Sequence, residues 1–515
     1  MRPAALVALV ALVLAALTAG CGWRRLCAVF PCPAPEPCEL GDDVVGGRVE
    51  PGAHDVVVPV RKKAWEATFG GEAAARPRVR ARLSGWPTTA LVDRTTLPTT
   101  DEAFLARLAS DTWRGLAAFT DREHHLPVDN VRLGPGEPRV GDYTNVTSVG
   151  LDLIAIVAAW ELELIPRADA VARVTDVLDV LDGLETHEGF FFNYYDTTSL
   201  ERTSNLVSFV DSSWLAAGLM VVRTTFEELA PRCTTLIERT DYRFFYDEAR
   251  GLMAHGYWTQ LGERSRYHYG VLYAESRLGS LIAIGKGDVP PAHWFRMTRT
   301  FAAGCKWQSR KPHGRRRKEA FGERYVGGWY EWEGARYVPS WGGSMFEALM
   351  PTLVVDEPRW APKSLGANDA VHVDVQRRWA LDVLGYPVWG MSPSATPAGA
   401  GYGEYGVSVL GSLGYQGGAV TPHAAALALA VAPADAAANL RELAHRYDIY
   451  GDYGFYDAVN PPSGVVARAY LALDQAMILI SAANRLKDGC IQKRFAADPI
   501  AQRAFPVLAE ERFFD

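Results

Sequence analysis

The chain has 515 residues, of which 48% are hydrophobic and 22% charged, and its formal net charge is −7. This length allows several average domains or one large catalytic domain. The mild acidity offers no basic surface, so we exclude nucleic acid as a partner. The 15 Trp, 21 Tyr and 20 Phe residues suit either a large core or a cleft that binds ligands through flat rings with a polar edge.

The first 20 residues are typical of a secretory signal. Arg2 precedes an apolar stretch from Ala4 to Leu17 that is too short to span a bilayer, and small residues lead from there to Cys21. This ending resembles a bacterial lipobox, which implies cleavage before Cys21 and lipid attached to that cysteine. We therefore expect residues 1–20 to be a lipoprotein signal peptide. The mature protein is then held on a bacterial membrane by its lipid alone, in the cell envelope facing the periplasm or the exterior.

Residues 21–43 are rich in Pro and Cys and lack periodicity, which predicts a stalk. Six cysteines follow Cys21 in the chain, and their spacing matches no metal motif. Disulfides and free thiols therefore both remain open for Cys27, Cys32, Cys38, Cys233, Cys305 and Cys490.

The remaining sequence changes character once. Residues 44–98 contain short β-branched runs such as HDVVVPV and RVRARL, broken by Gly and Pro, which predict an extended N-terminal segment. From Thr99 apolar residues recur at helical spacing, so we expect one all-α domain over residues 99–510. Further helical segments are expected at residues 147–164, 167–185, 211–229, 271–286, 366–384, 421–432, 434–447 and 464–485. Their arrangement in pairs favours an α/α toroid that presents its loops on one face, although a generic helical array would give the same pattern.

Acidic residues next to aromatic ones recur in the loops and at the expected helix starts. They are Asp211, Glu275, Glu331, Glu347, Glu404 and Asp457. Hydrolysis of a glycosidic bond needs two carboxyl groups, one to protonate the leaving oxygen and one to act on the anomeric carbon or on water. Aromatic neighbours can raise the pKa of such a carboxyl, so this pattern is compatible with glycoside hydrolysis.

Each of these acids also has a purely structural interpretation. Asp211 could cap a helix that starts at Ser212, and Glu275 could form an ion pair with Arg277. Glu347 could be a buried carboxylate bonded to backbone amides. Asp457 is more typical of a turn than of a catalyst, and Asp474 lies among apolar residues where a polar lock in the core is expected.

Other catalytic motifs are missing from the sequence. It contains no GxxxxGK[ST] phosphate loop, no Gly-x-Ser-x-Gly elbow and no HExxH pair. His268 and His293 lie beside aromatic residues, and we expect both to be structural. We predict neither a cofactor nor a metal site.

Several long blocks carry a family resemblance. Seven segments together resemble the glucoamylase-like glycoside hydrolase domain. They are YGVLYAESRLGSLIAIGKGDVPPAHWFRMTRT, SWGGSMFEALMP, YPVWGMSPSATP, GEYGV, TPHAAALALAVAPADAAANLREL, YGFYDAVNP and LALDQAMILISAANRLKDGCIQKRF. That group includes bacterial endo-β-1,2-glucanases and the transglycosylating domain of cyclic β-1,2-glucan synthases. The resemblance implies an (α/α)6 toroid and activity on a glucan or oligosaccharide, most of all one with β-1,2 linkages.

The resemblance also implies roles for individual residues. Glu275 is expected to be the general acid and Glu347 the second carboxylate in a retaining relative, whereas Asp211 would activate water in an inverting one. We expect the substrate to be bound by Arg277, Trp341, Trp389, Glu404, Tyr405, Tyr456 and Tyr194. The loop of Trp341, Gly342 and Gly343 is expected to let a sugar approach, with Glu347 near a helix N-terminus that favours its anion.

Two other functions remain open at this point. One is an α-glucan exo-hydrolase of the glucoamylase type, since fold does not decide the linkage that is cleaved. The other is a glucan-binding lipoprotein without catalytic activity.

Overall fold

The computed structural model describes residues 79–134, 138–302, 305, 310–398, 401–412 and 414–515. The expected signal peptide, Cys21, the stalk and most of the segment 44–98 lie outside these residues. The description below concerns the unit that holds nearly all of the described residues, within 40–301 and 307–515.

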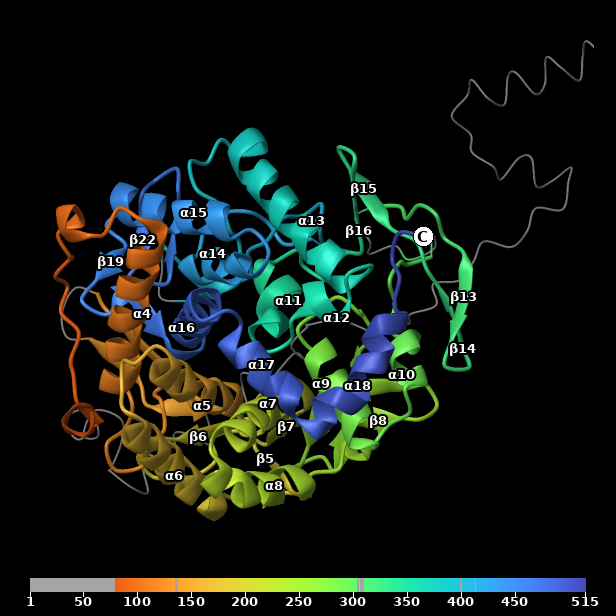
Figure 1. Cartoon of the computed structure of the whole chain (residues 1–515), viewed down its shortest axis with the longest axis horizontal. Helices are drawn as coiled ribbons and strands as arrows, with labels where there is room; N and C mark the ends of the chain where they lie inside the picture. Colours follow the sequence, from red (N-terminus) through yellow and green to blue (C-terminus); the bar gives the residue numbers. More distant parts are fainter. Residues whose placement is uncertain (1–78, 135–137, 303–304, 306–309, 399–400, 413) are drawn as a thin grey trace, which may run out of the picture. The chain divides into compact units, whose positions relative to one another are not determined.

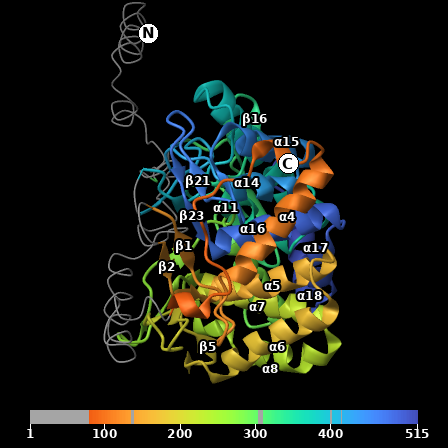
Figure 2. The ribbon, with the colours of Figure 1, turned by 90° about the vertical axis from the view of Figure 1, so that its left-hand side faces the viewer.

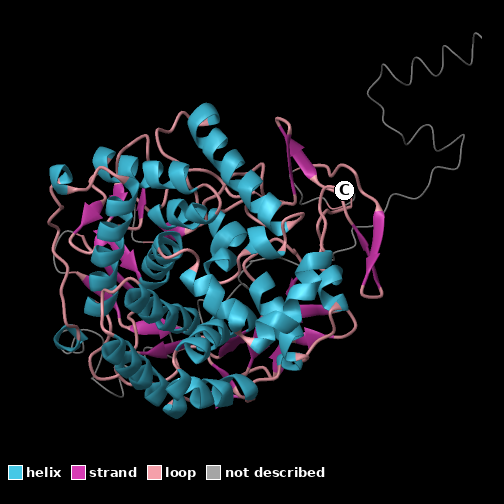
Figure 3. Cartoon of the chain, in the orientation of Figure 1, coloured by secondary structure: helices cyan, strands magenta, loops and turns pink. Residues whose placement is uncertain are grey.

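Helices make up most of this unit (Figure 3). They are α4 (Asp101–Ala118), α5 (Val146–Glu161), α6 (Arg167–Gly183), α7 (Phe209–Thr225), α8 (Ala230–Glu238), α9 (Arg277–Lys286), α10 (Ala292–Arg296), α11 (Met345–Leu349), α12 (Glu357–Trp360), α13 (Leu365–Arg378), α14 (Pro422–Leu427), α15 (Pro433–Arg446), α16 (Ala472–Leu486), α17 (Cys490–Ala497) and α18 (Pro499–Glu510). The expected helical segments are confirmed in outline. However, α9 and α16 begin six and eight residues later than the sequence indicates, and α8, α10, α12, α17 and α18 were not predicted.

Six helices contact one another in a closed cycle. α5 packs against α7 and α16, α7 packs against α9, and α14 packs against α11 and α16. The link between α9 and α11 is made by Arg277, which donates hydrogen bonds to the carbonyl oxygens of Glu347 and Ala348. These inner helices are apolar on most of their surface: in α5, for example, residues 146–159 are all buried. A helix that is hydrophobic all round is expected in the interior.

A second set of helices covers the inner cycle. α4 packs against α16, α6 against α5, α8 against α7, α18 against α9, α13 against α11 and α15 against α14. Figure 1 shows α4, α6, α8, α13 and α15 at the periphery of this unit. They are amphipathic. In α15, Leu440 and Leu443 are buried while Glu442 and Arg446 pair on the exposed side. No helix among the described residues is both long and apolar enough to cross a bilayer.

Short antiparallel strands occupy the loops, so the expectation of an all-α domain is incomplete. Three sheets have three strands: β2 (Arg139–Gly141), β1 (Asn130–Arg132) and β23 (Ala469–Leu471); β11 (Glu263–Arg264), β10 (Gly256–Trp258) and β7 (Leu206–Ser208); and β12 (His268–Tyr269), β9 (Leu252–Ala254) and β8 (Tyr246–Asp247). The pairs are β3 (Tyr143–Asn145) with β6 (Tyr194–Asp196), β4 (Thr186–His187) with β5 (Phe190–Phe191), β13 (Arg317–Ala320) with β14 (Glu323–Val326), β15 (Tyr330–Trp332) with β16 (Ala335–Tyr337), β17 (Ser394–Ala395) with β18 (Tyr402–Gly403), β19 (Tyr450–Gly451) with β20 (Gly454–Phe455), and β21 (Ala458–Val459) with β22 (Val466–Ala467).

Several of these strands lead directly into inner helices. β3 precedes α5, β7 precedes α7 and β23 precedes α16. In Figure 2, β1, β2, β5, β21 and β23 lie together on the left of the view, whereas α4, α6, α17 and α18 lie to the right. These five strands therefore lie on one side of the helical scaffold. The segment RVRARL differs from its prediction, because residues 79–82 are helical rather than extended.

Two glycines let α5 and α7 approach closely. A Cβ atom on Gly150 would lie 2.4 Å from the carbonyl oxygen of Trp214, and one on Gly218 would lie 2.4 Å from the carbonyl oxygen of Gly150. Both distances are shorter than any normal contact of a methyl group. The two helix backbones therefore touch where only hydrogen atoms fit.

Candidate active site

Each of the six inner helices has a polar side chain in its first turn or just before it. These are Thr147 in α5, Asp211 in α7, Glu275 before α9, Glu347 in α11, His423 in α14 and Asp474 in α16. The N-terminus of a helix carries a partial positive charge that favours nearby anions. The fold thus brings acids from distant parts of the sequence to corresponding places on consecutive helices.

Glu275 lies in the turn before α9 and is 9% exposed. Burial and the nearby charge of Glu347 raise the pKa of Glu275 to about 7, while a backbone hydrogen bond and the charge of Arg277 oppose this rise. A carboxyl group with a pKa near 7 can hold a proton at neutral pH and release it during a reaction. Its environment therefore suits the general acid predicted from the sequence.

Glu347 is the third residue of α11 and is 5% exposed. Its carboxylate accepts hydrogen bonds from the Ser340 hydroxyl at 2.8 Å, the Gly342 amide at 3.0 Å and the Ser344 amide at 3.2 Å. Burial raises the pKa of Glu347, and these donors oppose the rise because they bind the anion. The prediction of a site near a helix N-terminus is confirmed, and so are the backbone hydrogen bonds of the structural interpretation.

Asp211 is the third residue of α7, which begins at Phe209 and has Ser208 as its N-cap. The idea that Asp211 caps a helix starting at Ser212 is therefore wrong. The hydroxyl of Thr147 donates to Asp211 Oδ1 at 2.7 Å, and the hydroxyl of Ser208 donates to Oδ2. Burial raises the pKa of the Asp211 carboxyl, and these donors oppose the rise.

These three acids form one electrostatic group. The charges of both Glu347 and Asp211 raise the pKa of Glu275. Burial raises the pKa of the Tyr269 phenol, and the charges of Glu275 and Asp211 raise it further. Burial and the charges of Glu347 and Glu275 likewise raise the pKa of the Tyr415 phenol. Carboxyls in such a group titrate at different pH values, as a division into proton donor and anion requires.

Tyr269 and Tyr415 were missed by the sequence reasoning. Tyr415 is half-buried, and its ring packs on Gly342, where a Cβ atom would lie 2.1 Å from the ring. Both tyrosines occur in loops with many other aromatic residues, so the sequence holds no signal that separates them from their neighbours.

The expected role of Arg277 in substrate binding is wrong. The side chain is fully buried, and its guanidinium donates to both oxygens of Glu357 at 2.8 Å. Its remaining donors bind the carbonyl oxygens of Ala274, Glu347 and Ala348 at 2.6–3.1 Å. The internal ion pair with Glu275 is also not formed, because Glu357 takes its place.

The aromatic candidates for substrate binding divide by exposure. Tyr456 is fully buried, so its ring face is closed to a sugar and that expectation is wrong. Trp341 and Trp389 are 4% and 3% exposed, and their roles in substrate binding stay predictions. Tyr194 and Tyr405 are partly exposed and Glu404 is exposed, so they remain accessible to a ligand.

The two glycines after Trp341 serve packing rather than access. Gly343 has a φ of +78°, and a Cβ atom there would lie 2.1 Å from the carbonyl oxygen of Val407. Together with the contact of Gly342 and Tyr415, this presses the loop against residues 407–415. The expectation that these glycines open space for a sugar is therefore wrong.

The remaining candidates lie outside this group. Glu331 is exposed on β15 and lies 3.8 Å from Arg336. His268 lies 3.0 Å from Asp247, and fully buried His293 contacts the Gly251 carbonyl and the Ser280 hydroxyl. The structural roles expected for both histidines are confirmed.

Residues 312–499 match a family model whose description is "putative glucoamylase". The chain is 25% identical to the cyclic β-(1,2)-glucan synthase NdvB of Rhizobium meliloti over 79% of its own length, and it covers only 18% of that protein.

Two solved structures have the same fold. An endo-β-1,2-glucanase from Chitinophaga pinensis, in complex with sophorotriose and glucose, has a TM-score of 0.61 at 17% identity, over 80% of this chain and 98% of the other. A β-1,2-glucanase from Parabacteroides distasonis has a TM-score of 0.65 at 17% identity, over 80% of this chain and 61% of the other. The comparisons thus confirm that this chain resembles the glucoamylase-like glycoside hydrolase domain and its relatives among the enzymes of β-1,2-glucan.

Proposed function

We propose that the chain is a glycoside hydrolase that cleaves β-1,2-glucan, built as an (α/α)6 toroid. The observation that carries this proposal is the pair Glu275 and Glu347, two buried carboxyls on neighbouring inner helices, of which Glu275 has its pKa raised to about 7. The fold shared with β-1,2-glucanases and the partial match to a cyclic β-1,2-glucan synthase support the choice of linkage.

The proposed chemistry needs two events. Glu275 gives its proton to the glycosidic oxygen, so that the bond to the anomeric carbon breaks and the leaving sugar departs as an alcohol. In a retaining reaction Glu347 attacks the anomeric carbon and forms a glycosyl ester; water then attacks this ester while the Glu275 carboxylate takes its proton, which releases Glu347 as an anion and leaves Glu275 protonated again. In an inverting reaction Asp211 takes a proton from the water that attacks the anomeric carbon. Proton exchange with solvent then returns Asp211 to its anion and Glu275 to its acid.

A substrate panel tests this function. Purified protein should release reducing sugar from linear β-1,2-glucan and little from β-1,3-glucan or starch. Release from starch would favour an α-glucan exo-hydrolase, and binding of glucan without turnover would favour a binding lipoprotein. NMR of the anomeric proton during early hydrolysis then separates attack by Glu347, which retains configuration, from attack by water, which inverts it.

The raised pKa of Glu275 predicts the alkaline limb of the pH profile. The group acts as an acid only while protonated, so kcat/KM should fall about tenfold per pH unit once the pH exceeds about 7. Kinetics between pH 5 and pH 9 measure this limb. Asp152→Asn is a matched control, because burial also raises the pKa of Asp152 to about 7 but its neighbours are in α4 and α6. The assignment would be contradicted if the alkaline limb of kcat/KM shifted in Asp152→Asn but stayed unchanged when Glu275 is replaced.

We also propose that the protein reaches the cell envelope and carries lipid on Cys21, as the lipobox-like ending of residues 1–20 indicates. Labelling with a fatty acid tests this directly, because Cys21→Ser should remove both the label and the association with membranes.

A further inference from the structure

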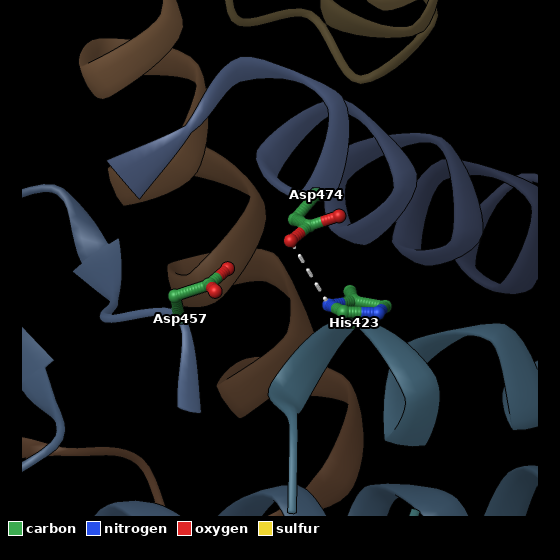
Figure 4. A group of neighbouring side chains, drawn as sticks. All are labelled: His423, Asp457 and Asp474. Atoms are coloured by element: carbon green, nitrogen blue, oxygen red, sulfur yellow. Dashed lines mark ion pairs between the residues drawn. The ribbon is translucent and has the colours of Figure 1, made fainter. Parts of the chain in front are cut away.

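Three polar side chains that the proposed reaction does not use meet one another. His423 is the second residue of α14, Asp457 lies between β20 and β21, and Asp474 is in the first turn of α16. Their exposed fractions are 1%, 2% and 2%. One possible ligand atom from each lies within 4.8 Å of the other two, and Figure 4 shows the three side chains pointing toward one another.

The atoms that face each other lack hydrogen bonds. His423 Nδ1 has no hydrogen-bond partner among the described residues and lies 3.4 Å from Asp474 Oδ2. Its other ring nitrogen lies 3.5 Å from the Thr421 hydroxyl. In Asp457, Oδ2 accepts from the Ala395 amide at 2.6 Å, whereas Oδ1 has no hydrogen bond. A buried polar atom left in this state costs about 1–3 kcal/mol.

The contacts left to the imidazole are long. A proton on Nδ1 would donate to Asp474 Oδ2 over 3.4 Å, and Nε2 has only the Thr421 hydroxyl at 3.5 Å. Both distances exceed the usual length of a hydrogen bond in a protein.

The surrounding charges also favour a cation. Asp129 adds negative charge near Asp474, and Arg132 supplies positive charge near Asp457. Burial raises the pKa of the Tyr402 phenol, and the charges of Asp474 and Asp457 raise it further. Among the described residues, Arg132 forms no ion pair with Asp457 or Asp474, and no lysine or arginine contacts the two acids there. A divalent ion would neutralise both acids at once.

We propose that His423, Asp457 and Asp474 bind one divalent transition-metal ion, for which Zn²⁺ is the best fit. One imidazole nitrogen and two carboxylate oxygens are ligands that zinc takes at about 2.0–2.2 Å, whereas Ca²⁺ and Mg²⁺ prefer oxygen alone. Two ligands of a tetrahedral ion with such bonds lie about 3.4 Å apart, which matches the 3.4 Å between His423 Nδ1 and Asp474 Oδ2. The ligand atom of Asp457 lies within 4.8 Å of both others, so ion binding would draw it closer.

The ion would join three segments of the scaffold. α14 and α16 are neighbours in the inner cycle, and Val459, two residues after Asp457, pairs with Val420 just before α14. The ion would thus crosslink these segments, so we expect its main effect on the stability of the fold.

Zinc binding by the full mature chain tests the proposal. After dialysis against a chelator, calorimetric titration with ZnCl₂ should show about one tight site per chain, and zinc should raise the Tm. Asp474→Asn and His423→Gln should weaken this binding by about 100-fold or more. The matched control is Asp152→Asn, which changes another buried aspartate and retains every cysteine, and it should bind like the wild type.

Two outcomes would overturn the proposal: a wild-type protein that binds no equivalent of zinc, or cluster variants that bind as tightly as the control. Should the variants fail to fold, one equivalent of Co²⁺ on the wild type decides the matter. Visible absorption typical of tetrahedral nitrogen and oxygen ligation supports the site, whereas a strong thiolate charge-transfer band assigns the metal to cysteine and rejects it.

Discussion

Glu275→Gln should lower kcat on linear β-1,2-glucan by about 10²–10⁴-fold, the usual contribution of a general acid. The side chain keeps its size and stays buried before α9, but the amide cannot give a proton to the leaving oxygen. Binding of the glucan should persist, because no negative charge or bulk is added. Reducing-sugar release and isothermal titration with glucan measure the two effects separately.

A matched control is Glu331→Gln, since Glu331 is exposed on β15 and lies outside the electrostatic group. It should retain wild-type kcat. A Glu275→Gln protein that turns over at the wild-type rate would show that the proton comes from another group, and Glu347 would then be the first to replace.

Arg277→Met should lower the free energy of unfolding by about 3–5 kcal/mol, as expected when one partner of a buried ion pair is removed. The change leaves the fully buried Glu357 without its bidentate partner and removes the donors to the Glu347 and Ala348 carbonyls. Because these bonds join α9 to α11, the folded fraction should also show a lower kcat with an unchanged KM. Urea unfolding and steady-state kinetics measure the two effects.

Arg446→Met provides the same substitution at the surface. Arg446 pairs with Glu442 one turn away on α15, and both side chains are more than 40% exposed, so the loss should stay below about 1 kcal/mol. Equal losses in the two variants would mean that the buried network around Arg277 contributes nothing beyond an ordinary surface pair.

The helical scaffold was largely predictable because its signal is local. Apolar residues at helical spacing mark α4, α5, α7 and α15, and their structures follow. The strands escaped prediction since most have only two or three residues, too few to show alternation. α9 and α16 were extended too far at their N-termini, where the apolar pattern continues through a turn or a strand that buries the same side chains.

Partners distant in sequence explain the errors at the site. Glu347 was placed correctly because its helix start is encoded by the adjacent Ser344. Arg277 was misread because its partner, Glu357, lies 80 positions away. Asp457 was predicted to be a turn residue and Asp474 a structural polar residue in the core. Each prediction agrees with the local segment in which the residue lies. Only the closed cycle of helices brings them to His423.

The close contact of Gly150 with α7 also affects the candidate active site. Thr147 stands one turn before Gly150 on α5, and Asp211 stands two turns before Gly218 on α7, so the hydrogen bond between Thr147 and Asp211 depends on how near the two backbones come. A methyl group at Gly150 would push the helices apart and draw that hydroxyl away from its carboxylate. Function would then be lost by adding a methyl group that touches no acidic side chain, with every one of these side chains still present in the sequence.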